Sequence, residues 1–191
     1  MSETAFARLS QEQVLERLLT PQPTLVLFHV NPDADAVGSA FALAELLRAN
    51  PNYEVRLSRP TPTTALGSSN TTSLRARVND ANAWGADYFI SIHTNASENP
   101  QANGVEAFAY SRPSRAFSLG ESILTSLSAA TGQRNRGMQV RPGLYVLRKT
   151  AMPAILLEIG FISNPEEAAL MNGNPALFAR GIYNGIVAEL G

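Results

Sequence analysis

Three polar side chains that could do chemistry stand directly after short apolar stretches of the sequence. His29 follows "TLVLF", His93 follows "YFISI" and Glu158 follows "PAILL". Short apolar runs of this kind are typical of buried parallel strands, and open α/β sheets bind ligands beyond the carboxyl ends of such strands. His29 and His93 are the only two histidines of the chain. We therefore interpret the three residues as one site, although a structural hydrogen bond is the alternative for any single histidine.

Imidazole and carboxylate groups together form a donor set for zinc, manganese or iron. Two histidines and a carboxylate that leave a position open are a recurrent catalytic zinc arrangement. Asp33 and Asp35 would add hard oxygen donors, and their alternative role is an Asx turn or helix cap before Ala36. Glu158 could be a metal ligand or a general base, and the sequence leaves both open. The chain has no cysteine, which excludes thiolate zinc sites and cysteine nucleophiles.

Other polar and charged positions allow weaker hypotheses. Gly38 and Ser39 could receive an anion at a helix start, or the glycine could allow tight packing of the helix against a strand. Arg134 and Arg136 could steer an acidic substrate. The remaining charged residues that we considered are expected to be solvated or salt-bridged at the surface: Arg75, Arg77, Glu98, Glu166 and Glu167.

Composition describes an ordinary globular protein. The chain has 191 residues, of which 45% are hydrophobic and 16% charged, enough for one domain with its own core. A net charge of −1 and a pI near 6.1 argue against nucleic acid as a partner. The N-terminal stretch "MSETAFARLSQEQVLERLL" has neither a signal-peptide nor a membrane-span pattern. We therefore expect no membrane partner and a soluble chain as written, cytoplasmic if it is expressed as such.

Strand and helix patterns alternate along the chain. This alternation predicts an α/β fold, a single domain with a mostly parallel twisted sheet and helices on both faces. We predict strands at 24–28, 53–57, 88–92, 105–110, 144–147 and 154–157, and helices at 10–19, 37–47, 74–84 and 113–130, with a last helix that begins at Asn174-Pro175.

Four sequence stretches carry a family resemblance. They are "RARVNDAN" (75–82), "SIHTNAS" (91–97), "GVEAFAY" (104–110) and "LYVLRKTAMPAILLEIGFISNPEEAAL" (144–170). In these, residues 50–191 resemble the zinc-dependent N-acetylmuramoyl-L-alanine amidases (amidase type 3), which cut peptidoglycan between the muramic acid lactyl group and L-alanine. The resemblance implies that His93 is a zinc ligand and Glu158 the catalytic acid/base, on an amidase-like α/β fold.

Residues 1–49 depart from that pattern. The amidase family has a Gly-His-Gly-Gly-like turn and a later Glu ligand, whereas the turn here is "FHVNPDADAVGSAF" and Leu43 stands where the Glu is expected. The stretch instead resembles the first motif of the DHH phosphoesterases, which would make His29, Asp33 and Asp35 metal ligands. With only two histidines, the chain cannot contain the Asp-His-His segment of that family. We therefore predict a DHH-like helix-strand-helix segment joined to an amidase-like body, a natural or engineered chimera; an unusual natural amidase is the alternative.

Three functions follow as hypotheses. The first is a metal-dependent amidase acting on peptidoglycan or a muropeptide, with Zn²⁺, or Mn²⁺ in its place, held by His29, His93 and Asp33 or Asp35. Replacement of the usual His/Glu ligand segment could impair it. The second is an inactive folded chimera that at most binds metal, and the third is a DHH-type phosphodiesterase. Related amidases act in the cell envelope or outside the cell, and the sequence leaves the oligomeric state open.

Overall fold

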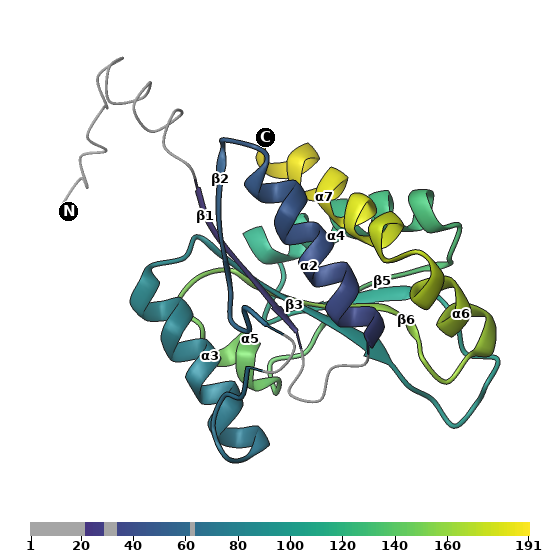
Figure 1. Ribbon diagram of the computed structural model, residues 1–191, viewed down its shortest axis with the longest axis horizontal. Coiled ribbons are helices and arrows are strands. Elements are labelled where there is room, and N and C mark those ends of the chain that lie inside the picture. Colours follow the sequence, from purple (N-terminus) through teal and green to yellow (C-terminus); the bar gives the residue numbers. More distant parts are fainter. Residues whose placement is uncertain (1–21, 29–33, 62–63) are drawn as a thin grey trace, which may run out of the picture.

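A mixed sheet of six strands forms the centre of the molecule (Figure 1). The structure is a computed structural model; it describes the backbone of residues 22–28, 34–61 and 64–191, and side chains from residue 38 onward within these ranges. The strands are β1 (Gln22–Phe28), β2 (Tyr53–Leu57), β3 (Tyr88–Asn95), β4 (Val105–Ala109), β5 (Asn135–Val140) and β6 (Ala154–Phe161). The helices are α2 (Ala34–Arg48), α3 (Asn70–Trp84), α4 (Arg115–Thr131), α5 (Tyr145–Lys149), α6 (Pro165–Gly173) and α7 (Pro175–Leu190).

Strand β6 separates two parts of the sheet that run in opposite directions. The spatial order is β2-β1-β3-β6-β4-β5. Strands β2, β1, β3 and β6 are mutually parallel, whereas β4 is antiparallel to β6 and β5 is parallel to β4. Four of the five pairings are therefore parallel, and the predicted single α/β domain with a mostly parallel sheet is confirmed.

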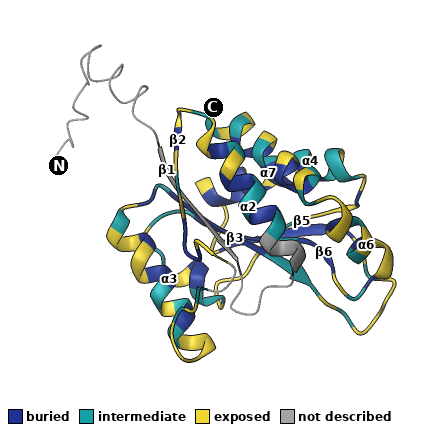
Figure 2. Cartoon of the chain, viewed as in Figure 1, coloured by how far each residue is buried: buried dark blue, intermediate teal, exposed yellow. Residues whose placement is uncertain are grey.

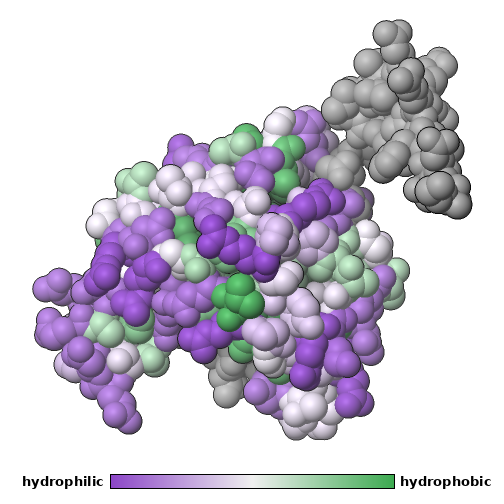
Figure 3. Space-filling model, turned by 180° about the vertical axis from the view of Figure 1, so that it is seen from behind, coloured by the Kyte–Doolittle hydropathy of each residue, from purple (hydrophilic) through white to green (hydrophobic). Residues whose placement is uncertain are grey.

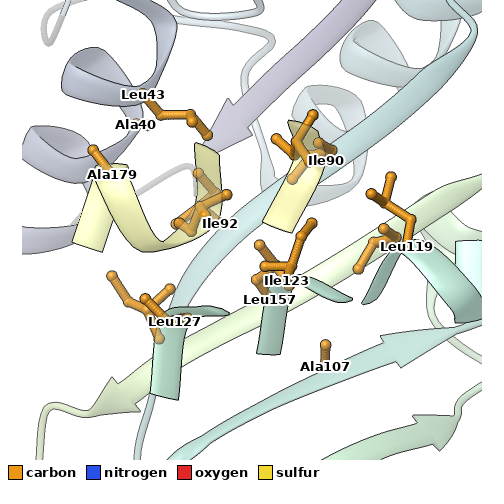
Figure 4. Close-up of a cluster of buried hydrophobic side chains, with 14 of the residues drawn as sticks. Ala40, Leu43, Ile90, Ile92, Ala107, Leu119, Ile123, Leu127, Leu157 and Ala179 are labelled. Atoms are coloured by element: carbon orange, nitrogen blue, oxygen red, sulfur yellow. The ribbon is translucent and has the colours of Figure 1, made fainter. Parts of the chain in front are cut away.

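Helices cover both faces of the sheet, because alternate strand residues point to opposite sides. One face buries its apolar side chains against α2, α4 and α7, where Ile92, Leu157 and Ala107 meet Leu43 and Ile123 (Figure 4). The other face packs on α3 and α5 through a smaller cluster of buried residues: Phe89, Phe108, Ala154 and Leu156 from the sheet, with Val78, Ala81, Val146 and Leu147 from the helices. The buried residues are concentrated in the sheet and on the helix sides that face it (Figure 2).

Local signals account for several element ends. Helix α3 begins at Asn70 because Ser69 and Thr72 form a capping box, so it starts four residues before the predicted helix at 74. Ser114 accepts a hydrogen bond from the Phe117 amide at the start of α4, and Gly132 ends that helix in the left-handed conformation.

Three sequence-based assignments differ from the structure. The predicted strand at 144–147 is part of helix α5, because a short apolar run fits either element and here Val146 and Leu147 pack from a helix onto the sheet. Strand β5 and helix α6 were not predicted. The predicted helix at 10–19 lies outside the described residues.

The face seen from behind carries many hydrophilic side chains, with apolar side chains scattered among them (Figure 3). Among the described residues, the large apolar side chains that are exposed are Tyr110, Val140 and Ile162. No helix in the described ranges is long and apolar enough to cross a membrane.

Candidate active site

His93 and Glu158 are direct neighbours across the parallel pair β3 and β6. Residues that pair in register point to the same face of a sheet. Ile92 and Leu157, the preceding pair, belong to the core under α2, α4 and α7, so His93 and Glu158 point to the face that carries α3 and α5. The structure therefore brings together two of the site residues predicted from the sequence, near the carboxyl ends of their strands.

Each of these two side chains sits partly within the protein. His93 is half-buried, and its Nε2 atom lies 2.8 Å from the hydroxyl of Ser91, two residues earlier on the same strand face. Glu158 is half-buried as well, and its Oε2 atom is buried. An imidazole oriented by a hydroxyl and flanked by a carboxylate has the chemistry of a metal ligand beside a general base.

Glu106 adds a carboxylate that sequence reasoning did not identify. It lies on β4 directly opposite Glu158 and is 6% exposed. Its Oε1 atom accepts a hydrogen bond from Asn95 Nδ2 (2.7 Å), and its Oε2 atom accepts bonds from Arg136 Nε (3.0 Å) and Gln139 Nε2 (3.1 Å). The signal that could have found it is the single charge inside the apolar strand "GVEAFAY", because a buried carboxylate needs partners.

A bulge in β6 shapes the end of the site. His93 pairs with Glu158, but the next pair in the ladder is Asn95 with Phe161, so β6 contains an extra residue there. Gly160 lies at this point with φ of 154°, in the region that favours glycine. Asn95 forms hydrogen bonds to two segments next to the bulge. Its backbone carbonyl accepts a bond from the amide of Ile162, just after β6 (2.8 Å), and its side chain donates to Glu106 on β4.

The two arginines considered as a steering pair have different surroundings. Arg136 pairs with the buried Glu106, and its guanidinium lies 5.1 Å from the centre of the Phe161 ring. Arg134 is exposed and lines a separate surface cavity of about 460 Å³ together with Glu166. Only Arg136 belongs to the network around Glu106.

The other predicted ligands cannot be placed. His29 and Asp33 lie outside the described residues, and Asp35 lies in the first turn of α2, where side chains are not described. Gly38 is in the second turn of that helix, and a Cβ atom there would come within 3.1 Å of Pro175. The close neighbour of this glycine is therefore helix α7 and not the strand that was predicted. Within the part of the chain whose side chains are described, no group of three or more metal-binding side chains is found. Of the residues predicted to form a metal site, His93 and Glu158 have described side chains, and imidazole and carboxylate are both groups that zinc accepts as ligands.

Two residues expected at the surface are buried. Arg77 is 3% exposed and donates from Nη1 to Ser58 Oγ (3.0 Å); burial, and then the nearby charge of Arg59, lower its pKa to about 10. Glu167 is 7% exposed and accepts hydrogen bonds from distant parts of the chain. Its donors are the amides of Gly104 and Phe161, each at 2.7 Å, and Gln133 Nε2 at 2.8 Å. Glu98, Glu166 and Arg75 are exposed, as expected.

The structure is an α/β domain in which His93 and Glu158 lie side by side near the carboxyl ends of two parallel strands. The chain belongs to the amidase type 3 family, described as N-acetylmuramoyl-L-alanine amidase, whose family model matches residues 36–188. The matched range includes most of α2, so it begins inside the segment that the sequence analysis assigned to a DHH-like opening.

Curated relatives agree with this family. The amidase CwlM of Bacillus licheniformis is 36% identical over 144 residues, which are 74% of this chain and 53% of CwlM. The amidase LytC of Bacillus subtilis strain 168 is 30% identical over 169 residues, 84% of this chain and 34% of LytC. The chain thus spans between a third and about half of the length of these relatives.

Solved structures share the fold. The catalytic domain of CwlV, an N-acetylmuramoyl-L-alanine amidase from Bacillus (Paenibacillus) polymyxa var. colistinus, superposes with a TM-score of 0.73 at 29% identity, covering 88% of this chain and 98% of that domain. The CwlD amidase of Clostridioides difficile, solved in complex with the GerS lipoprotein, has a TM-score of 0.78 at 23% identity and supports the fold alone, over 87% of this chain and 98% of CwlD.

Proposed function

We propose that this chain hydrolyses the amide bond between the lactyl group of muramic acid and L-alanine in peptidoglycan. The observation that carries the proposal is the in-register pair of His93 and Glu158 on neighbouring parallel strands. The pair occupies the two family-like motifs "SIHTNAS" and "LLEIGF" in a chain that belongs to the amidase family. An inactive chimera and a phosphodiesterase are not favoured by the relatives, which are amidases.

A zinc ion is the proposed cofactor, with Mn²⁺ as the competing ion. His93 supplies one ligand. Phe28, the last residue of β1, pairs with Ile92, and His29 follows Phe28 in the sequence. We propose His29 as the second ligand and Asp33 or Asp35 in place of the carboxylate ligand expected in this family. When bound, zinc would polarise the amide carbonyl and lower the pKa of water in the site.

Glu158 is the proposed acid/base. Its place beside His93 allows it to take a proton from the attacking water and to deliver that proton to the departing amine of L-alanine. Ser91 orients the imidazole of His93. Glu106 accepts three hydrogen bonds from neighbouring side chains and is a positioning residue that fixes β4 and the end of β3 next to Glu158.

The chain is proposed to be a composite of a DHH-like opening segment and an amidase body. Up to about residue 49 it resembles the first DHH motif, and Leu43 occupies the position where the amidase family has a ligand. Leu43 is fully buried in the core of the structure, so this position contributes packing and no metal donor. A metal site of the chain must therefore draw its carboxylate ligand from elsewhere.

The test is turnover of a purified muropeptide, with zinc content measured by elemental analysis. We expect release of the L-alanine-led stem peptide by the zinc-loaded protein and a loss of roughly 10²-fold to 10⁴-fold in Glu158→Gln, which should retain zinc. Full activity of this variant would overturn the role of Glu158. Turnover of a small phosphodiester, without muropeptide cleavage, would overturn the proposed function.

A further inference from the structure

A buried carboxylate on helix α6 joins the end of β6 to the start of β4. Glu167 is 7% exposed, and its Oε2 atom accepts a hydrogen bond from the Phe161 amide (2.7 Å). Its Oε1 atom accepts bonds from the Gly104 amide (2.7 Å) and from Gln133 Nε2 (2.8 Å). Phe161 is the last residue of β6, and Gly104 directly precedes β4. We name Glu167 and its three donors the Glu167 clamp.

The hydrogen bonds of the Glu167 clamp are short and charge-assisted. An ionised acceptor forms shorter and stronger bonds than a neutral one, and both bonds from backbone amides are 2.7 Å long. Among the described residues, no lysine or arginine forms an ion pair with Glu167. A buried carboxylate is costly unless its oxygen atoms have donors. The placement of α6 and the placement of the two strand ends therefore depend on each other.

The Glu167 clamp lies at the bulge that follows Glu158 on β6. Ile159 belongs to the core under α2, α4 and α7. A Cβ atom at Gly160 would point toward the same side, because it would lie 3.1 Å from a methionine sulfur of that core and 3.4 Å from Glu167 Oε2. The regular alternation of side chains is thus interrupted directly after Glu158, as expected at a bulge. Glu167 holds the far side of this interruption through the amide of Phe161.

Further hydrogen bonds attach the connection between β3 and β4 to the residues after β6. These bonds run from the Ile162 amide to the Asn95 carbonyl (2.8 Å), from the Ser97 amide to Ser163 Oγ (2.9 Å) and from Asn164 Nδ2 to the Ala102 carbonyl (3.2 Å). Together with the Glu167 clamp they make one hydrogen-bonded unit of the segments 95–104 and 161–167. In the sequence this unit begins two residues after His93 and three residues after Glu158.

We propose that Glu167 is a positioning residue of the active site, which fixes the carboxylate of Glu158 relative to His93 through the bulge of β6. This inference rests on the proposed amidase function, in which Glu158 serves the attacking water and the departing amine in turn. A misplacement of about 1 Å, caused far from the chemistry, can lower a rate by roughly 10²-fold. Glu167 acts through the backbone of Phe161 and Gly104 and takes no part in the proton transfers.

The experiment measures kcat and KM for muropeptide cleavage by the zinc-loaded protein and its variants, at a temperature at which all of them are folded. Glu167→Gln keeps the size of the side chain, but its amide nitrogen cannot accept a hydrogen bond. We expect kcat to fall roughly 10-fold in Glu167→Gln and roughly 100-fold in Glu167→Ala, which removes every acceptor. Because substrate binding is not involved, KM and zinc content should stay within about twofold in both variants.

Two control variants separate positioning from stability and from charge. Ile186→Ala removes a fully buried side chain of α7 and should lower the Tm as strongly as a clamp variant, with kcat unchanged. Glu166→Gln changes the exposed neighbour of Glu167 and should also keep its kcat. A merely structural Glu167 would lower the Tm without changing the kcat of the folded protein. Unchanged kcat in both Glu167 variants, or an equal loss of kcat in Ile186→Ala, would overturn the proposal.

Amide hydrogen exchange gives a readout that needs no turnover. The Ile162 amide donates to Asn95 and not to Glu167, so it reports on the bulge without being a part of the Glu167 clamp. In Glu167→Gln its protection should fall roughly 10-fold relative to the core amide of Ile90, and in Ile186→Ala this ratio should stay unchanged. If the intact protein cleaves no muropeptide, the amidase proposal fails, and the exchange ratio still tests the Glu167 clamp. An unchanged ratio in Glu167→Gln would overturn it.

Discussion

Glu106 and Glu158 lie directly opposite each other on the antiparallel strands β4 and β6. The two carboxylates have different surroundings. Glu106 is 6% exposed and accepts hydrogen bonds from Asn95, Arg136 and Gln139, which link three strands. Glu158 has His93 as its register partner on the other side. In the proposed mechanism Glu106 positions its neighbours and Glu158 carries the chemistry.

The first prediction concerns the orientation of His93. Its Nε2 atom lies 2.8 Å from Ser91 Oγ, and loss of a group that orients a ligand typically weakens metal binding by about 10-fold to 100-fold. Ser91→Ala is expected to weaken zinc by that factor, measured by competition with a chelating dye, and His93→Ala should weaken it further. Thr125→Ala, on the exposed side of α4, is the control and should bind zinc normally. Unchanged zinc affinity in Ser91→Ala would remove Ser91 from the site.

The second prediction concerns the aspartates of the opening segment. If Asp33 or Asp35 replaces the missing carboxylate ligand, the double variant Asp33→Ala, Asp35→Ala should lose zinc affinity, because a zinc site needs enough donors to close around the ion. Elemental analysis after dialysis measures this directly. Normal zinc content together with a lower Tm would instead assign the two aspartates to stabilisation of the start of α2.

The third prediction concerns Glu167, which ties α6 to the ends of three other segments. Glu167→Ala leaves the amides of Gly104 and Phe161 and the side chain of Gln133 without their acceptor. We expect a loss of about 3 kcal/mol or more in the free energy of unfolding, and a Tm lower by about 6–12 °C. Glu166→Ala changes the exposed neighbour and should stay within about 0.5 kcal/mol. A Tm difference near zero between the two variants would contradict this account.

The fourth prediction concerns the hydroxyl of Tyr53. It is buried and has no hydrogen-bond partner among the described residues, a situation that costs about 1–3 kcal/mol. Tyr53→Phe should therefore raise the free energy of unfolding by about 1 kcal/mol and the Tm by about 2–4 °C. Tyr183→Phe is the matched control: it removes an acceptor used by Asn50 Nδ2 (3.1 Å) and should not stabilise the protein.

The stability that Tyr53→Phe gains over the intact protein should depend on pH. Burial, and then the neighbouring Tyr183, raise the pKa of Tyr53 above its ordinary value of 10.0. The folded state therefore favours the neutral phenol of Tyr53. The part of the folding stability that depends on this neutral form is present below pH 10.0 and is lost as the pH rises through the raised pKa. Thermal unfolding at pH 8 and pH 11 should show a steeper alkaline loss in the intact protein than in Tyr53→Phe. Equal losses would contradict the raised pKa.

Much of the sheet could be predicted from the sequence because its central strands are apolar runs with clear ends. The predicted strand 53–57 coincides with β2, and the starts of β3, β4 and β6 were correct. Strand β5 was missed because it lies at the edge of the sheet and reads "NRGMQV", where polar side chains and a glycine hide any alternation. Helix α6 was missed although Asn164 and Pro165 form a recognisable helix start.

The site could be predicted only where residue type alone indicates chemistry. His93 and Glu158 were proposed because they end apolar runs, and the structure shows that the two strand ends bring them side by side. Glu106 and Glu167 were not found, because their role depends on donors that are distant in sequence and meet only in the folded chain. A carboxylate near a helix start, such as Glu167, is usually a surface charge.

Strand β6 has consequences for how this protein can vary in length. It pairs in parallel with β3 and antiparallel with β4, and its bulge is already matched to Asn95. A one-residue slip turns the side chains of a strand to the opposite face. Insertion or deletion of one residue between Ala154 and Glu158 would therefore move the glutamate away from His93 and from Glu106 at once. Related chains should tolerate length changes in the connections before and after β6, and none within it.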